Sequence, residues 1–153
     1  MLLEIAKTVM LKTPPDDVWT LLSDPAAVAA CLPNVRDFKA ADEPNRYTTL
    51  LVERLGPFQV QIPLTLDVTE DDGARQMRAA VAGDDRGGQA RVRGDVTATV
   101  RASGEGSVLD VQTKAEVLGR MATLGAVPIR RRGDQIFDQF IANLAARLEG
   151  RDG

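Results

Sequence analysis

The final stretch of the chain, residues 125–148, predicts one long amphipathic helix. From Ile129 onward, its large apolar residues recur at steps of one, three and four: Ile136, Phe137, Phe140, Ile141, Leu144 and Leu148. This spacing puts them on one side of a helix with 3.6 residues per turn. Pro128 suits the first helical turn and Gly150 suits the end. At 1.5 Å per residue the helix would be roughly 30–35 Å long, so it needs a broad apolar surface to lie against.

Three long segments with alternating apolar and polar residues predict that surface. The apolar parities are Phe58, Val60, Ile62, Leu64, Leu66 and Val68; then Val92, Gly94, Val96, Ala98 and Val100; then Leu109, Val111, Thr113, Ala115 and Val117. Turn compositions rich in Gly, Asp and Asn separate the segments. Each strand therefore has one dry face and one wet face, which is typical of an antiparallel sheet covered on one side.

The first 33 residues predict a strand followed by a helical corner. Alternation gives a strand over residues 2–12, after which Thr13 suits a helix cap and Pro14 the first helical position. Ser23, Asp24 and Pro25 repeat the start signal for a short helix over residues 26–32. We therefore expect an α+β, helix-grip fold: a curved antiparallel sheet wrapped around the C-terminal helix, with two short helices after the first strand. Residues 1–150 would form one domain, and residues 151–153 a frayed end.

Composition narrows the chemistry that the protein can perform. The chain of 153 residues contains no histidine, which removes the commonest general base, the commonest metal ligand and every Ser-His or Cys-His nucleophile. The net charge of −3 argues against a nucleic-acid binder. One cysteine rules out an intrachain disulfide, and no apolar run reaches the ~18 residues that span a bilayer. We expect a cytoplasmic protein with no metal site.

Small side chains on the dry parity predict space beneath the helix. Gly94, Ala98, Thr113 and Ala115 leave room unless the few aromatic residues (Trp19, Phe58, Phe137, Phe140) fill it. Two alternatives stay open: a ligand cavity, or a core that closes by tilting the helix. The predicted cavity lining is Leu51, Glu53, Phe58, Val60, Ile62, Met77, Val81, Val92, Val96, Ala98, Val111, Thr113, Phe137, Phe140, Ile141 and Leu144.

Glu53 is the one candidate for a catalytic group. It shares parity with Leu51 and Leu55, which would aim its carboxylate at the dry face. There it could act as a general acid or hold the polar head of a ligand. In the alternative, Leu50 and Val52 face inward and Glu53 is solvated, because charged residues are rarely buried without a partner.

Three further features each have a functional and a structural interpretation. Arg130, Arg131 and Arg132 lie at the start of the helix, where the dipole disfavours positive charge; they form either a docking patch for an acidic partner or membrane surface, or a solvated face in which Arg130 pairs with Asp134. The apolar stretch 121–124 is either a gate or a tight connection. Cys31, without a histidine to activate it, is expected to be inert and semi-buried.

Several local motifs are shared with one known family. They are Thr-Pro-Pro-Asp-Asp-Val-Trp at 13–19, Leu-Ser-Asp-Pro at 22–25, Ala-Cys-Leu-Pro at 30–33, Leu-Gly-Pro at 55–57, Gly-Gly-Gln-Ala at 87–90 and Gly-Arg-Met-Ala-Thr-Leu-Gly at 119–125. With them the chain resembles the family of the carbon monoxide dehydrogenase G subunit, within the START-like, helix-grip superfamily. Ile62-Pro63-Leu64 departs from the family, in which an aromatic residue and a glycine often occur here.

The resemblance implies an accessory protein with a hydrophobic cavity, associated with a molybdenum-containing hydroxylase. We therefore expect non-enzymatic binding of a quinone or lipid, with no covalently bound cofactor and at most peripheral membrane contact. Two alternatives remain: a cyclase or dehydratase of the same superfamily that uses Glu53, and an assembly module with no ligand that acts through Arg130–Arg132.

Overall fold

The structure is a computed structural model that describes residues 1–151. Its main element is a seven-stranded antiparallel sheet. The strands are β1 (Leu2–Leu11), β2 (Val35–Ala40), β3 (Arg46–Leu55), β4 (Phe58–Asp71), β5 (Gln76–Asp84), β6 (Arg91–Ser103) and β7 (Gly106–Leu118). Their order is β1-β7-β6-β5-β4-β3-β2, so only β1 departs from a plain meander, by pairing with β7. The predicted antiparallel sheet is confirmed.

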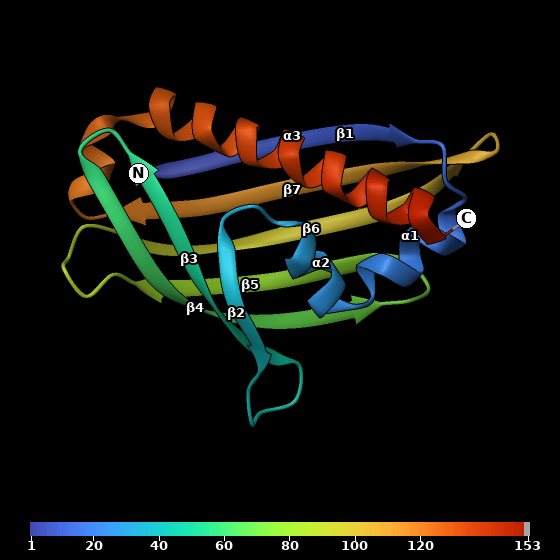
Figure 1. Cartoon of the computed structure of the whole chain (residues 1–153), viewed down its shortest axis with the longest axis horizontal. Coiled ribbons are helices and arrows are strands. Elements are labelled where there is room, and N and C mark those ends of the chain that lie inside the picture. The colour runs from blue at the N-terminus through green and yellow to red at the C-terminus, as the bar shows by residue number, and fades with distance from the viewer. Residues whose placement is uncertain (152–153) are drawn as a thin grey trace.

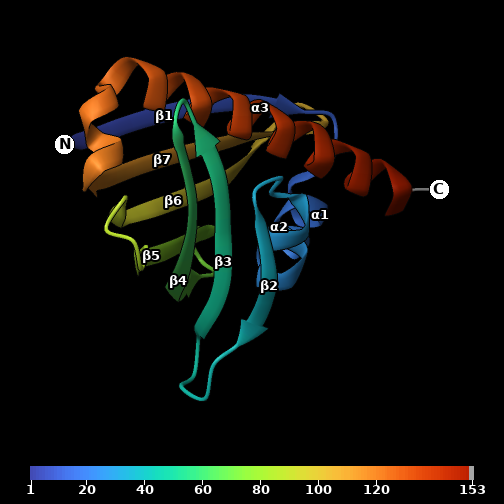
Figure 2. The same cartoon turned by 60° about the vertical axis from the view of Figure 1, so that its left-hand side comes forward.

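The sheet curls strongly, and its two edges approach each other. Figure 1 shows β1, β7 and β6 running along the long axis while β3 and β2 cross in front of them. The turned view in Figure 2 shows the same strands enclosing an interior, with α3 (Ala126–Arg151) lying across its open side. This is the helix-grip architecture that the sequence predicts. It forms because every long strand has one apolar face and α3 is the element long enough to cover them.

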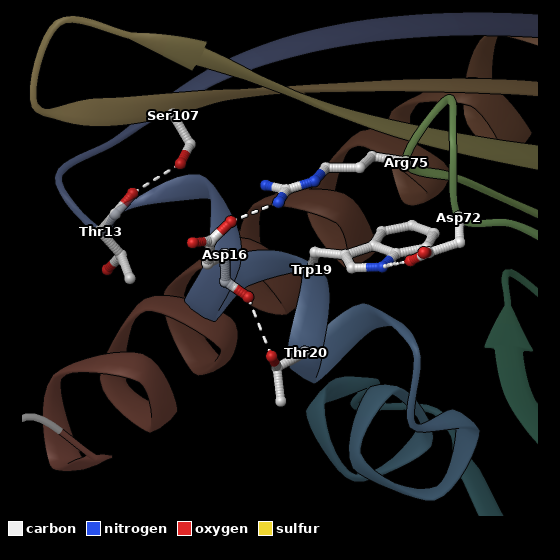
Figure 3. A network of polar contacts seen from close by, with 7 residues as sticks. All are labelled: Thr13, Asp16, Trp19, Thr20, Asp72, Arg75 and Ser107. Carbon is white, nitrogen blue, oxygen red and sulfur yellow. Dashed lines mark hydrogen bonds and ion pairs between the residues drawn. The ribbon is translucent and has the colours of Figure 1, made fainter.

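The short helices α1 (Pro15–Leu22) and α2 (Pro25–Cys31) close one end of this interior (Figure 2). Figure 3 shows how α1 is held: the indole N–H of Trp19 donates to Asp72 at 2.8 Å, and Arg75 pairs with Asp16. Both partners belong to the turn between β4 and β5. The hydroxyl of Ser107, at the start of β7, donates to the carbonyl oxygen of Thr13 at 2.6 Å. The corner is therefore fixed to two hairpins that lie far from it in the sequence.

Two clusters of fully buried side chains make up the core, one at each end of the sheet. The first joins α1, α2 and the last turns of α3 to Val100 and Leu109. The second joins β1 and β4 to the 3-10 helix η1 (Arg120–Leu124) and the start of α3, and its members are Leu3, Val60, Ile62, Leu64, Ala90, Val117, Met121 and Ile129. The interior is thus packed at both ends of the sheet, whereas side chains in its middle are only half-buried.

Several predicted boundaries are wrong. The first helix begins at Pro15, one residue late, and Thr13 does not cap it; its carbonyl is engaged by Ser107 and its side chain is buried. The second begins at Pro25, with Asp24 accepting a hydrogen bond from the amide of Ala27. Gly150 does not end α3, which continues to Arg151. Arg151 is the last residue of α3, residues 152–153 lie outside the described part, and the frayed end expected at 151–153 stays a prediction.

Gly83 lies near the end of β5. A Cβ there would lie 2.5 Å from the carbonyl oxygen of Pro63 and 2.9 Å from Ile62. Glycine is required because β4 and β5 approach each other closely where their pairing begins, at Leu64 and Gly83. Pro63 precedes that first pair, so its missing N–H removes no bond from the β4–β5 ladder.

Candidate functional site

The middle of the concave face carries apolar side chains that solvent still reaches. One row crosses five neighbouring strands through paired positions: Val68, Ala79, Val96, Thr113 and Ile5. All five are half-buried, although α3 lies over the same face (Figure 2). We call this row the central strip. The rows on either side hold further half-buried residues: Leu66, Val81, Gly94 and Ala115 on one side, and Met77, Ala98 and Val111 on the other.

The facing side of α3 has the same character over its central turns. Ile136, Phe137 and Ile141 are half-buried, whereas Leu144 and Leu148 farther along are fully buried against α1 and α2. Protein interiors normally pack to crystal-like density, and a fully packed residue loses nearly all its exposed surface. The accessible apolar surface between two packed clusters is therefore the feature of this core that a hydrophobic ligand could use.

Ion pairs attach α3 to the edge strand β1 and to β3, the strand next to the other edge. Lys7 of β1 binds Asp134 at 2.9 Å, and Glu53 of β3 binds Arg132 at 2.6 Å. Both strand residues occupy the apolar, inward parity of their strands. Close packing supports the β1 contact, since a Cβ on Gly133 would lie 3.2 Å from Ile5. Two ion pairs thus hold α3 over the sheet, and their helix members, Arg132 and Asp134, lie on either side of Gly133.

Glu53 is buried, with 9% of its surface exposed, so the alternative in which it is solvated is wrong. It is buried with partners: its carboxylate accepts hydrogen bonds from Arg132 Nε at 2.6 Å, Asn34 Nδ2 at 3.1 Å and the amide of Arg54 at 3.3 Å. Sequence parity offered this inward position of Glu53 as one of two alternatives. It did not identify Asn34 or Arg132 as partners, because they lie 19 and 79 residues away.

A pocket of about 580 Å³ opens next to this carboxylate, between the end of β3 and the first turns of α3. Val52, Leu55, Gly56 and Pro128 form its apolar wall, and Glu53, Arg54, Gln59, Arg131, Arg132 and Gln135 form its polar wall. β2 pairs with β3 only as far as Val35 and Leu51, so the end of β3 is a free sheet edge here. Of the residues predicted to line a cavity, only Glu53 lines this pocket.

The other predicted lining residues fall into two groups. Those with accessible surface are Leu51, Phe58, Met77, Val81, Val92, Val96, Ala98, Val111, Thr113, Phe137 and Ile141. Val60, Ile62, Phe140 and Leu144 are instead buried in the two packed clusters. Alternation along a strand predicts which side chains point inward, and the pairing of whole strands decides which inward positions are packed.

The three consecutive arginines do not form one patch. Arg130 and Arg131 are exposed, whereas Arg132 turns inward to Glu53. The predicted pair between Arg130 and Asp134 is absent among the described residues, because Asp134 binds Lys7. At 100° per residue, successive helical side chains point in different directions, so Arg132 can face the sheet while Arg130 and Arg131 stay exposed.

Cys31 and the stretch 121–124 have structural surroundings. Cys31 is buried at the end of α2; burial raises the pKa of its thiol, and the nearby Arg147 partly offsets this rise. A raised pKa keeps the thiol neutral and unreactive. Met121 is buried in the second cluster, and its amide donates to the carbonyl of Gln89 at 2.8 Å. The stretch is therefore a tight connection in this structure.

Comparison with known proteins places the chain in a family. Its sequence matches the family of the carbon monoxide dehydrogenase G subunit (CoxG) over residues 8–149. The chain belongs to the CoxG family. A search among curated protein sequences found no match.

Solved structures share the fold of this CoxG family member. A conserved protein from Geobacillus kaustophilus is 17% identical, with a TM-score of 0.85, over 97% of this chain and 96% of that chain. A START superfamily protein from Mycobacterium smegmatis is 13% identical, with a TM-score of 0.72, over 96% and 97%. The Zhui aromatase/cyclase from Streptomyces is 14% identical, with a TM-score of 0.60, over 99% and 93%. The START-like, helix-grip fold is thus established. No helix within residues 1–151 is long and apolar enough to cross a bilayer.

Proposed function

We propose that this CoxG family protein binds a hydrophobic small molecule, a quinone or a lipid, between the concave sheet face and α3. The carrying observation is the central strip, where apolar side chains of four strands and Thr113 of a fifth stay accessible between two packed clusters. A ligand there would remove this surface from water, at roughly 25 cal/mol per Å² before the costs of association. Thr113 is the one polar side chain of the strip and would orient a polar group of the ligand.

The family suggests a setting for this binding. We propose that the protein serves as an accessory to a molybdenum-containing hydroxylase of the carbon monoxide dehydrogenase type. A carrier of this kind would hold the ligand without transforming it. The absence of histidine from the whole sequence supports a binding role, because the side chain most often used for proton transfer is missing.

Native mass spectrometry tests the binding proposal directly. The intact purified protein is weighed, and any released compound is identified after solvent extraction. We expect a stoichiometric quinone or lipid. A mass equal to that of the polypeptide alone, together with no binding of a short-chain quinone added to the protein, would contradict the proposal.

An enzymatic role is a second candidate, favoured by the convergence of Glu53, Asn34 and Arg132 beside a pocket. Against it, the two carboxylate oxygens already accept hydrogen bonds from protein donors, which leaves less capacity to handle a substrate proton. Glu53→Gln distinguishes the two roles. Loss of turnover of an extracted ligand, with binding retained, would make the protein an enzyme.

Partner docking is a third candidate, favoured by the exposure of Arg130 and Arg131 in a protein of net charge −3. Their location at one end of α3 would suit an acidic surface on another protein. Arg130→Gln with Arg131→Gln should then weaken co-purification with the hydroxylase. Unchanged co-purification would remove these two arginines from the interface.

A further inference from the structure

The pocket beside Glu53 has a charge imbalance that the binding of an apolar molecule does not explain. Three arginines and one glutamate line it: Arg54, Arg131, Arg132 and Glu53. The glutamate is fully engaged by Arg132, Asn34 and the amide of Arg54. Among the described residues, neither the guanidinium of Arg54 nor that of Arg131 makes an ion pair. Two arginines among the residues that line this pocket are therefore without an ion-pair partner in the described chain.

The chemistry of these groups specifies a class of ligand. A guanidinium presents its N–H donors in a planar fork that matches the oxygens of a carboxylate or phosphate. Gln59 and Gln135, whose side-chain amides are neutral donors, also line the pocket. The start of α3 lies alongside, and the positive end of a helix dipole also favours an anion. The pocket volume of about 580 Å³ is within the range of small-molecule sites.

The apolar wall indicates what an oxyanion here would be attached to. Val52, Leu55 and Pro128 offer hydrophobic contact that a free inorganic anion does not use. Leu55 and Glu53 also share the inward parity of β3 with Leu51, so the pocket lies at the rim of the concave face. A molecule with a charged head and an apolar body fits both walls.

We propose that this pocket is the head-group site for an anionic amphiphile, a carboxylate or phosphate ester whose apolar body extends toward the central strip. Arg54 and Arg131 bind the head group. Arg132 pairs with Glu53 and holds its carboxylate in place, so that this carboxylate does not neutralise Arg54 or Arg131. The placement of the apolar body rests on the proposed function; the head-group site rests on the pocket alone.

Calorimetric titration with three probes separates the two claims. Octyl phosphate carries both parts, 1-octanol carries only the apolar body, and inorganic phosphate carries only the head. We expect octyl phosphate to bind at least about tenfold more tightly than either of the others. Its affinity should fall as salt rises from about 50 to about 300 mM, because exposed charges are screened, whereas that of 1-octanol should not fall.

Matched variants test the residues. Arg54→Gln combined with Arg131→Gln should reduce the affinity for octyl phosphate about tenfold or more, to that of 1-octanol, without changing the binding of 1-octanol. Both residues are without ion pairs in the described chain and lie at the surface, so the urea midpoint should be unchanged. Arg147→Gln is the control: it removes an exposed arginine of the same helix, about four turns away, and should leave every affinity unchanged.

The outcomes are distinguishable. Equal affinities for octyl phosphate and 1-octanol in the unmodified protein would overturn the head-group site and leave apolar binding intact. Inorganic phosphate binding as tightly as octyl phosphate would overturn the amphiphile in favour of a free anion. Arginine-dependent binding of octyl phosphate without any binding of 1-octanol would support the head-group site and contradict the apolar site.

Discussion

Glu53 and Arg132 form a pair whose two members are buried to different extents. The side chain of Glu53 is 9% exposed and that of Arg132 is 33% exposed. Removing one partner of a buried pair is costly because the other charge is left without compensation. The cost should therefore depend on which partner is removed.

We expect Arg132→Met to lower the free energy of unfolding by about 3 kcal/mol, because it leaves a buried carboxylate. Glu53→Gln should cost less, about 1–2 kcal/mol, since the arginine can turn toward water and the amide still accepts from Asn34. Urea unfolding of both variants measures the difference. Equal costs, or a larger cost for Glu53→Gln, would show that the pair is effectively solvated.

Cys31 makes stability depend on pH in the alkaline range. Burial raises the pKa of the folded thiol above its unfolded value, with Arg147 opposing. Above the unfolded pKa of about 8.5 the unfolded thiol ionises while the folded thiol keeps its proton, which favours the unfolded state.

The sign follows from the number of protons bound in each state. Between the unfolded and the folded pKa the unfolded chain binds fewer protons at Cys31 than the folded protein does. The free energy of unfolding therefore falls as pH rises through this window. Below the unfolded pKa both states keep the proton, so the contribution of the neutral thiol is fully present there.

We expect the free energy of unfolding to fall more steeply between about pH 8 and about pH 10 in the unmodified protein than in Cys31→Ala. Urea midpoints at several pH values give the pH dependence of stability for both proteins. The cost of losing the sulfur atom is the same at every pH, so it does not affect the comparison of the two slopes. Parallel slopes would mean that the thiol titrates alike in both states. Slow modification of the thiol by a disulfide reagent, accelerated by urea, is the matching kinetic expectation.

At the scale of the element, α3 has two functions along its length. Its last turns pack against α1 and α2, and its central turns lie over the central strip. Side chains in these two regions should differ in what their removal does.

Leu144→Ala should cost about 3 kcal/mol, because Leu144 is completely buried and the packed cluster cannot collapse around the space it leaves. Phe137→Ala, in the half-buried region, should cost less than about 2 kcal/mol despite removing a larger side chain. Its main effect should be weaker ligand retention. Thermal unfolding and extraction of each variant measure both quantities; the reverse order of stability would place the packed core under the middle of α3.

At the scale of the whole molecule, the sheet and α3 are packed together at the two ends of the interior, while the centre stays accessible. At one end, α1 and Thr13 before it are bonded to the β4–β5 turn and to β7 (Figure 3). Ion pairs connect α3 to β1 and β3. This arrangement supports the fold without filling its middle. A ligand in the middle should therefore add stability to the whole.

Val96→Phe tests this directly, because Val96 lies between the small side chains Ala79 and Thr113. The larger ring should occupy the space above the central strip and prevent ligand retention, with the urea midpoint of ligand-free protein unchanged or raised. The unmodified protein should gain about 2.7 kcal/mol at a ligand concentration about 100 times Kd, and the variant should gain none. A strongly destabilised Val96→Phe would show that the strip is already filled.

The sequence by itself determined the elements and their inward faces. Alternation in the long strands, the periodicity of the last helix and the start signals near Pro15 and Pro25 are local, so they predicted the antiparallel sheet and the three helices, with small errors at the boundaries. Inward parity also placed Glu53 on the apolar face. These features depend on backbone geometry, which repeats about every 2 residues in a strand and about every 3.6 in a helix. The resulting pattern of apolar residues can be recognised in a short stretch of sequence.

Only the tertiary structure decided which inward residues meet. Arg132 reaches Glu53, Lys7 takes Asp134 from Arg130, and Asn34 completes the carboxylate's partners, across separations that no local pattern encodes. The structure also divided the dry face into packed ends and an accessible centre. Packing is set by the curl of seven strands and the path of α3 across them, so it depends on contacts between segments far apart in the chain.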